Sequence, residues 1–379
     1  MDTSQDHLPK AITPDAINEL LVSIGLPKAT DIAPAKVIAA YHSIYMVLLP
    51  PNEKTSYDEL VLRVSGHHLP QIKTANEVDV MAWILKNTTI PVADLVAYDD
   101  SSNNPIGYEY TLLARVPGET LSDIYSTPGE EHINKIIDHL ADILIQLHEH
   151  EWDEIGGLNL DAQGEVRPAQ VVDETFWTVP ELKLWPPRET IASLNIAGPY
   201  ASHTDYVSAQ IRQYIRLIQL HDKLAFMRDD ISRLEAFLTA ISSRATGLSR
   251  TKLVLAHKDL HFANMMYDRG TCRITAILDC EFSCIVPCQQ WSPRRAFSWN
   301  GQDGEASMAE KKRLWELFTA RCEERNLTSF LNDAKFTSPL QRVVDYVRAI
   351  VEVSPRDQRK ELVPSWRAMA LENIAHFGV

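Results

Sequence analysis

The sequence predicts a two-lobed α+β protein in which a small, strand-rich amino-terminal lobe precedes a larger helical lobe. The chain has 379 residues, enough for more than one domain-sized unit. Its first third contains short β-branched and aromatic segments between turns, whereas later segments repeat apolar residues every three or four positions. The change falls near Val116-Pro117-Gly118, where proline and glycine interrupt regular structure. We therefore expect an N-lobe over residues 1–116 and a C-lobe over residues 117–379.

Capping and turn residues locate the elements of the expected N-lobe. A helix should follow Thr13 as its N-cap, with Pro14 in the first position, and should end at Gly25. The sequence 36–49 predicts two short strands around a turn. The other predicted elements are a strand over 58–64, a helix over 75–86, and strands within 92–98 and 108–116.

A long amphipathic helix should open the C-lobe, because Ile133, Leu140 and Leu147 belong to a series of apolar residues at helical spacing. The segment 161–199 is rich in proline and tryptophan and shows no clear periodicity. Beyond it, the sequence predicts helices over 205–220 and 229–241, short buried strands over 252–256 and 273–278, and mostly helix in roughly the last hundred residues.

Composition and charge exclude several classes of function. The hydrophobic share of 45% and the charged share of 23% are those of an ordinary globular protein. The 37 basic and 51 acidic residues give a formal charge of −14, so we expect neither nucleic acid nor a membrane surface as a partner. This charge could attract a cationic substrate, although a solvated acidic surface explains it more simply. The terminus MDTSQDHLPK lacks a secretory signal and no apolar run can span a bilayer, which predicts a cytoplasmic protein.

The cysteines do not indicate a disulfide framework. Of the five, Cys272, Cys280, Cys284 and Cys288 crowd one segment. Their spacing lacks both the paired CxxC of zinc sites and a fourth ligand. Buried, reduced cysteines that pack as small apolar side chains are the default expectation, with metal ligation as the alternative.

The segment from His257 to Glu281 carries the residues suited to chemistry. Phosphoryl transfer needs a carboxylate to orient the acceptor hydroxyl and oxygen ligands for Mg²⁺. Asp259 is followed five residues later by Asn264, which matches the kinase catalytic-loop pattern H-x-D-x-x-x-x-N. Asp279 then falls where the second metal-binding aspartate belongs. His257 is expected to support the loop through hydrogen bonding.

The sequences HKDLHFANMMYD and ITAILDCE resemble the aminoglycoside phosphotransferase family, whose pattern is H-x-D-L-x-x-x-N followed by I-D-W-E. Relatives of that family include choline, homoserine and methylthioribose kinases. Three further segments, DELVLRVSG, NEVDVMAWILKNTTIPVADLVAYD and YTLLARVPGETL, are similar to its third strand, early helix and hinge, in the same order. IGGLNLD and GPYASHTDYV are similar to fungal members. The resemblance implies a protein-kinase-like fold with ATP between the lobes.

This resemblance implies an ATP-dependent, magnesium-dependent kinase that phosphorylates a hydroxyl of a small metabolite or an aminoglycoside-like acceptor. Asp259 would act as the catalytic base or orient the acceptor. Asn264 and Asp279 would be catalytic residues through their role as magnesium ligands.

On the nucleotide side, the resemblance implies that Arg63 contacts the α- and β-phosphates and pairs with Glu77 of the early helix. The backbone at Ala114 and Val116 would meet the adenine edge. Glu77 has an alternative interpretation, because together with Asp79 it could belong to a solvated acidic face.

Three positions depart from the family pattern. Arg63 replaces the usual lysine, although arginine also carries a permanent charge and forks onto phosphate or carboxylate. The phosphate-covering turn expected at Ala39 to Ser43 contains no glycine. Cys280 replaces the tryptophan of D-W-E, whereas Glu281 keeps the acidic position. These departures leave open a kinase-like protein that binds a nucleotide or metabolite without transferring a phosphoryl group. A protein kinase is disfavoured because no D-F-G or A-P-E segment follows.

Several other side chains have two interpretations. His261 and Phe262 face either the acceptor or the interface between the lobes. Four tryptophans either line the substrate site or serve packing: Trp177, Trp185, Trp291 and Trp299. The pair Arg294 and Arg295 either clamps an anionic group of the substrate or lies on the surface.

Overall fold

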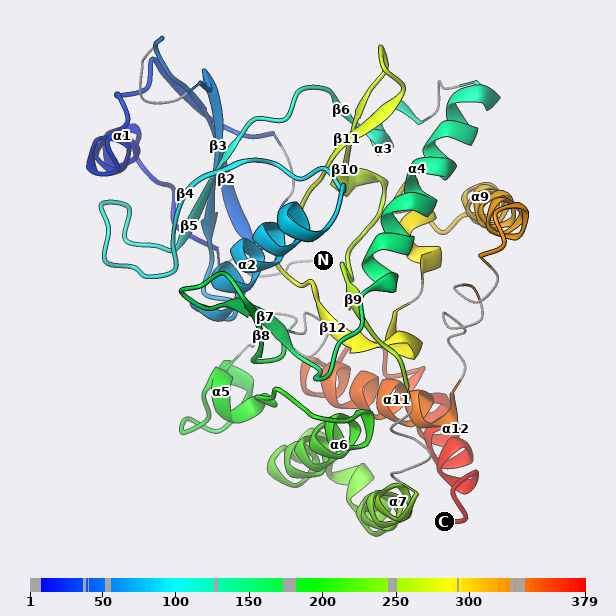
Figure 1. The fold of residues 1–379 in the computed structure, drawn as a ribbon. Coiled ribbons are helices and arrows are strands. Elements are labelled where there is room, and N and C mark those ends of the chain that lie inside the picture. The colour runs from blue at the N-terminus through cyan, green and yellow to red at the C-terminus, as the bar shows by residue number, and fades with distance from the viewer. Residues whose placement is uncertain are drawn as a thin grey trace.

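A computed structural model of the chain describes residues 8–36, 39, 41–51, 56–125, 129–172, 182–244, 251–291, 293–327, 331 and 338–379. Its amino-terminal part is built on an antiparallel five-stranded sheet, and helices dominate the rest of the described chain (Figure 1). In spatial order the strands are β1 (Asp31–Pro34), β2 (His42–Leu48), β3 (Glu59–Ser65), β5 (Tyr110–Ala114) and β4 (Leu95–Asp99). The predicted α+β class is therefore confirmed.

The two faces of this sheet serve different purposes. Helix α1 (Pro14–Ser23) packs on one face, where its side chains share a buried cluster with Leu62 and Val64 of β3. The predicted cap is present, since the Thr13 hydroxyl accepts a hydrogen bond of 3.2 Å from the Ala16 amide. Because strand side chains alternate, Arg63 points to the opposite face, toward helix α2 (Ile72–Asn87).

One strand prediction was wrong. The described residues of 36–49 contain a single strand, β2, and its partner β1 lies earlier in the chain, where Asp31 pairs with Leu48. Strand β1 is a mostly exposed edge strand, so it lacks the apolar alternation that marks a half-buried strand in a sequence. Of the expected phosphate-covering turn at Ala39 to Ser43, Ala40 lies outside the described residues, and the last two residues belong to β2.

The remaining elements form the helical part of the molecule and three small sheets. The helices are α3 (Leu121–Ile124), α4 (Glu130–Glu149), α5 (Ile191–Leu194), α6 (His203–Leu220), α7 (Ile231–Ser243), α9 (Glu305–Glu324), α11 (Pro339–Val353) and α12 (Val363–Ala375). The 3₁₀ helices are η3 (Leu182–Leu184), η4 (Asp222–Asp230), η5 (Phe262–Asn264), η6 (Cys288–Gln290), η7 (Pro293–Phe297) and η8 (Ser354–Arg356). In the described part of the chain, no helix combines the length and the apolar character that a bilayer crossing requires.

The small sheets carry the predicted catalytic segment. They are β11 (Arg273–Ile277) with β10 (Met265–Asp268) and β6 (Glu119–Thr120), β9 (Leu253–Ala256) with β12 (Cys284–Pro287), and β7 (Gly157–Leu160) with β8 (Val166–Ala169). The two strands predicted around the catalytic loop exist as β9 and β11, but each pairs with a different partner. The loop therefore connects a strand of one small sheet, β9, to a strand of another, β10.

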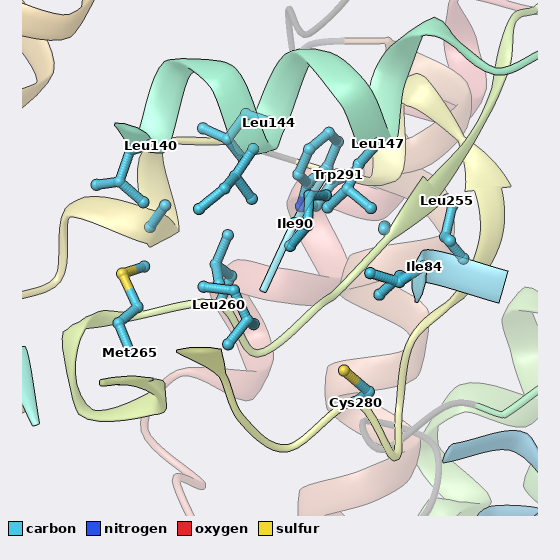
Figure 2. Close-up of a cluster of buried hydrophobic side chains, with 14 of the residues drawn as sticks. Ile84, Ile90, Leu140, Leu144, Leu147, Leu255, Leu260, Met265, Cys280 and Trp291 are labelled. Carbon is cyan, nitrogen blue, oxygen red and sulfur yellow. The ribbon is translucent and has the colours of Figure 1, made fainter. Parts of the chain in front are cut away.

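A cluster of buried hydrophobic side chains packs against this loop (Figure 2). Leu144 of α4 and Leu255 of β9 pack with Ile84 of α2, so the cluster joins the early helix to the helical part of the chain. Leu260 and Met265 extend into the same cluster from either side of the loop. Each fully buried side chain of this kind stabilises the fold by roughly 1.5–3 kcal/mol, so the loop backbone is held firmly.

The cysteines and most of the tryptophans in question serve packing. All five cysteines are free, and Cys280 is buried in the cluster of Figure 2, where burial raises the pKa of its thiol. Trp291 belongs to the same cluster, and the ring of Trp299 contacts that of Tyr125. Trp185 contacts the ring of His221. Trp177 lies outside the described residues.

Candidate active site

The loop that follows β9 takes its shape from its own hydrogen bonds. The Nε2 atom of His257 donates to the carbonyl oxygen of Leu278 at 2.9 Å, and the Asp259 amide donates to the His257 carbonyl at 2.7 Å. Burial lowers the pKa of His257, so the ring is neutral and supports the loop as expected. Between them, Lys258 has a φ of 59°, a left-handed conformation that residues with a side chain rarely adopt and that occurs preferentially at functional sites.

Asn264 holds Asp259 and is itself held beside the end of β11. Its Nδ2 atom lies 3.0 Å from the carbonyl oxygen and 3.1 Å from the Oδ2 atom of Asp259. Since Nδ2 is the donor of the amide, the Oδ1 atom of Asn264 remains available as an acceptor or a metal ligand. The Asn264 carbonyl accepts from the Leu278 amide at 2.9 Å, which brings Asp279 close to Asn264. The structure thus gathers the three predicted catalytic residues at one place.

Asp279 turns its side chain toward the sheet. It follows β11 with a φ of 65°, a left-handed conformation like those of Lys258 and Cys272 in the same segment. Its Oδ1 atom accepts a hydrogen bond from the guanidinium of Arg63. The side chains of Asp259 and Asp279 are 30% and 32% exposed, so both carboxylates remain open to a ligand. Carboxylate and amide oxygens are the hard donors that Mg²⁺ prefers, so this set fits that ion.

His261 faces Asp259, and Phe262 faces the core. The Nδ1 atom of His261 accepts from the Ala263 amide at 3.2 Å, which leaves Nε2 as the donor, 3.5 Å from Asp259 Oδ1. Burial raises the pKa of Asp259, but His261 and smaller charge effects, one of them from Arg295, outweigh burial. The pKa of Asp259 therefore lies below its ordinary value and the carboxyl is ionised at neutral pH. Phe262 is fully buried.

On the nucleotide side, Arg63 bridges two carboxylates. Its guanidinium contacts Glu77 of α2 and Asp279 at the same time. Glu77 is 1% exposed, which excludes its alternative interpretation as part of a solvated face. Burial lowers the pKa of Arg63, but the carboxylates of Glu77, Asp279 and Glu281 more than offset this and raise it above its ordinary value. The basic residue of β3 is thus a permanent cation between the early helix and the predicted metal ligand.

Below Arg63 lies a buried ionic cluster that was not predicted. Lys73 Nζ lies 2.6 Å from Oε2 of Glu281, 3.0 Å from Nε2 of His42 and 3.3 Å from Oγ of Ser65. The prediction missed Lys73 because α2 begins at Ile72 rather than at residue 75. Its position four residues before Glu77, on the same helix face, was the available signal.

This cluster ties the segment after Asp279 to the early helix. Burial raises the pKa of Glu281, and Lys73 opposes that rise. Burial, followed by the nearby charge of Lys73, lowers the pKa of His42, so its ring is neutral. Asn76 adds neutral contacts, donating from Nδ2 to the carbonyls of Glu281 at 3.1 Å and Ser283 at 2.9 Å. The position of Asp279 is therefore controlled from α2.

The two residues predicted to meet adenine differ in whether their backbone amide is free to bind a ligand. The Ala114 amide already donates at 2.8 Å to the carbonyl of Asp94, the residue just before β4. The Val116 amide makes no hydrogen bond to any other residue that the structure describes. Gly118, with a φ of 115°, passes so close to β10 that an added Cβ would lie 2.6 Å from the Tyr267 carbonyl oxygen. A glycine is required there, and it fixes the path of the chain just after Val116.

Comparison with solved structures identifies the fold. The chain superposes on the gentamicin complex of APH(2″)-IIa with a TM-score of 0.52 and 13% identity, covering 96% of this chain and 97% of that one. The ADP-bound aminoglycoside phosphotransferase APH(2″)-Ib gives a TM-score of 0.52 and 13% identity, with coverages of 96% and 98%. The predicted kinase-like fold is confirmed.

The family follows from the sequence match. A family model described as the phosphotransferase enzyme family matches residues 52–289, which is well over half of the chain. The protein belongs to this phosphotransferase family, as its motifs predicted. A subtelomeric hrmA-associated cluster protein of Aspergillus fumigatus, found in two strains, is 24% identical over 257 residues, which are 56% of this chain. The match spans only about half the length of these curated relatives, 50%.

Proposed function

We propose that the protein is a magnesium-dependent small-molecule kinase that transfers the γ-phosphoryl group of ATP to a hydroxyl of a small metabolite. The observation that carries this proposal is the arrangement of Asn264, which binds Asp259 through Nδ2, keeps Oδ1 free, and lies beside Asp279. An ionised carboxylate and two oxygen ligands then meet at one site. The ADP in the APH(2″)-Ib structure and the gentamicin in the APH(2″)-IIa structure support a nucleotide donor and a small acceptor.

In this proposal, Asp259 accepts a hydrogen bond from the acceptor hydroxyl and aligns its oxygen with the γ-phosphorus. The new bond joins that oxygen to the phosphorus as the bond from phosphorus to the β,γ-bridging oxygen breaks and ADP leaves. The hydroxyl proton passes to the Asp259 carboxylate and then to solvent. Magnesium, held by Asn264 Oδ1 and Asp279, would neutralise charge on the phosphates.

The nucleotide would lie between an N-lobe of residues 1–116 and a C-lobe of residues 117–379. Arg63, kept in place by Glu77, would contact the α- and β-phosphates. The adenine edge would meet the free amide of Val116, with Ala114 contributing through its backbone as the neighbouring hinge residue.

A second candidate function is binding of a nucleotide or metabolite without transfer. One observation favours it. The Arg63 guanidinium contacts Asp279, so a predicted metal ligand already has a cationic partner. Metal binding at Asp279 would have to compete with that contact.

Titration of ATP with and without Mg²⁺, followed by thermal unfolding, separates these candidates. The kinase proposal expects magnesium-dependent stabilisation of the wild type and its loss in Asp279→Asn, whereas Asp229→Asn on the exposed surface should behave as wild type. Stabilised protein that releases no ADP with any acceptor of a broad metabolite panel would favour the second candidate. No stabilisation at millimolar ATP and Mg²⁺ would refute the kinase proposal.

A further inference from the structure

The 3₁₀ helix η7 lies directly against the catalytic loop. The Phe262 amide donates to the Ser298 carbonyl at 3.1 Å, and the Ser298 amide donates to the Arg295 carbonyl at 3.0 Å. Ala296 and Phe297 are 1% and 0% exposed and pack into the main core cluster. Hydrogen bonds to the loop and packing into the core therefore hold the backbone of η7 close to the loop that carries Asp259.

The two arginines of η7 stand apart from this packing. Arg294 and Arg295 are exposed, and neither side chain makes an ion pair or hydrogen bond with another residue in the described ranges. Other arginines of the chain are paired with carboxylates, including Arg63, Arg216, Arg313, Arg321 and Arg367. Two adjacent guanidinium groups without a carboxylate partner among the described residues repel each other.

Hydrogen bonds link Arg295 to the predicted catalytic loop, because the Ser298 carbonyl accepts from the Phe262 amide and the Ser298 amide donates to the Arg295 carbonyl. In a chain of net charge −14, Arg294 and Arg295 therefore place positive charge on a short helix in contact with the loop of Asp259. A cationic acceptor would meet repulsion there, whereas an anionic group would be attracted.

We propose that Arg295, assisted by Arg294, binds an anionic group of the acceptor, so that the preferred substrate is a hydroxylated carboxylate or phosphate ester and not a cationic amino alcohol or aminoglycoside. This inference rests on the proposed kinase function. A guanidinium presents a planar fork that matches a carboxylate or a phosphate bidentately. The same chemistry could instead engage the γ-phosphate of ATP, and the experiment separates these two sources.

The test compares wild type with Arg295→Ala, Arg294→Ala and Arg295→Glu, using as control Arg233→Ala on α7, an exposed arginine that makes no ion pair with another described residue. ADP release would be measured with ATP and Mg²⁺, and thermal shift with Mg²⁺ and a non-hydrolysable ATP analogue, each with two sets of probes. The anionic set is glycerate, malate and glucose 6-phosphate, and the cationic set is choline, ethanolamine and kanamycin. Because Arg294 and Arg295 are exposed and make no ion pair with another described residue, their replacement should leave folding intact.

We expect the wild type to bind and turn over members of the anionic set. Arg295→Ala should raise KM for them about 10- to 100-fold with kcat little changed, Arg294→Ala should have a smaller effect, and Arg295→Glu should shift preference toward the cationic set. Magnesium-dependent stabilisation by ATP should stay as in wild type.

Preference for the cationic set, no binding or turnover of any anionic probe, or an Arg295→Ala variant with unchanged preference would overturn the inference. Weaker ATP binding in Arg295→Ala would assign the arginine to the nucleotide instead. In every one of these cases, stabilisation of the wild type by ATP and Mg²⁺ reports separately on the kinase proposal.

Discussion

The two sides of the candidate site are built in different ways. On the acceptor side, Asp259, His261 and Asp279 are each about one-third exposed and held by hydrogen bonds. On the nucleotide side, Arg63, Lys73, Glu77 and Glu281 form a buried ionic cluster in which each cation contacts a carboxylate. The first arrangement leaves charged groups free to meet a substrate. The second pairs its charges with one another and, through Arg63, holds Asp279 in position.

The largest expected effect concerns the acceptor side alone. Asp259→Asn keeps the shape of the side chain and removes the base, so kcat should fall by about 10²- to 10⁴-fold while ATP and Mg²⁺ still stabilise the protein. Steady-state ADP release with any acceptor identified for the wild type measures this, with Asp229→Asn as the matched surface control. Retained kcat would show that another group orients the acceptor, and lost nucleotide binding would show that the two sides are not separable.

The buried cluster should matter mainly for stability. Lys73→Met leaves Glu281 buried without its cation, and the free energy of unfolding should fall by about 3–5 kcal/mol. Urea unfolding measures the change, and adding Glu281→Gln to the variant should recover part of it. Lys86→Met, at the exposed end of the same helix, removes a surface ion pair and should cost at most about 1 kcal/mol. A Lys73→Met loss no larger than this control would mean that Glu281 is protonated in the folded protein.

The smallest expected effect lies where the two sides meet. Arg63→Lys keeps the charge on β3 but replaces the fork with one ammonium group, which cannot hold Glu77 and Asp279 equally well. Releasing Asp279 should lower the Mg²⁺ concentration needed for half-maximal stabilisation by ATP, by up to about fivefold for a partly exposed pair. The control is Arg115→Lys, whose partner Glu59 is on the surface. A higher magnesium requirement would mean that losing the Arg63 fork on the α- and β-phosphates outweighs the release of Asp279.

The sequence alone was sufficient wherever the signal was local. The five-residue spacing from Asp259 to Asn264 predicted the loop because η5 and its hydrogen bonds form within that span. Helix α1 could likewise be located from its N-cap and its apolar spacing. Strand β1 could not, since an exposed edge strand carries no apolar pattern.

Tertiary structure decided the contacts between distant segments. Arg63 and Asp279 are 216 residues apart, and Lys73 and Glu281 are 208 residues apart. Whether their charges meet depends on how α2 packs against the end of β11, and no local pattern encodes that. The same holds for Arg294 and Arg295, which acquire their proposed role only because η7 lies against the catalytic loop. The sequence by itself thus determined the family, the fold class and the identity of the loop residues, because short-range spacing and capping carry that information. Only the folded chain decided which charges are buried together and which remain free, because burial and pairing depend on packing between segments far apart in the sequence.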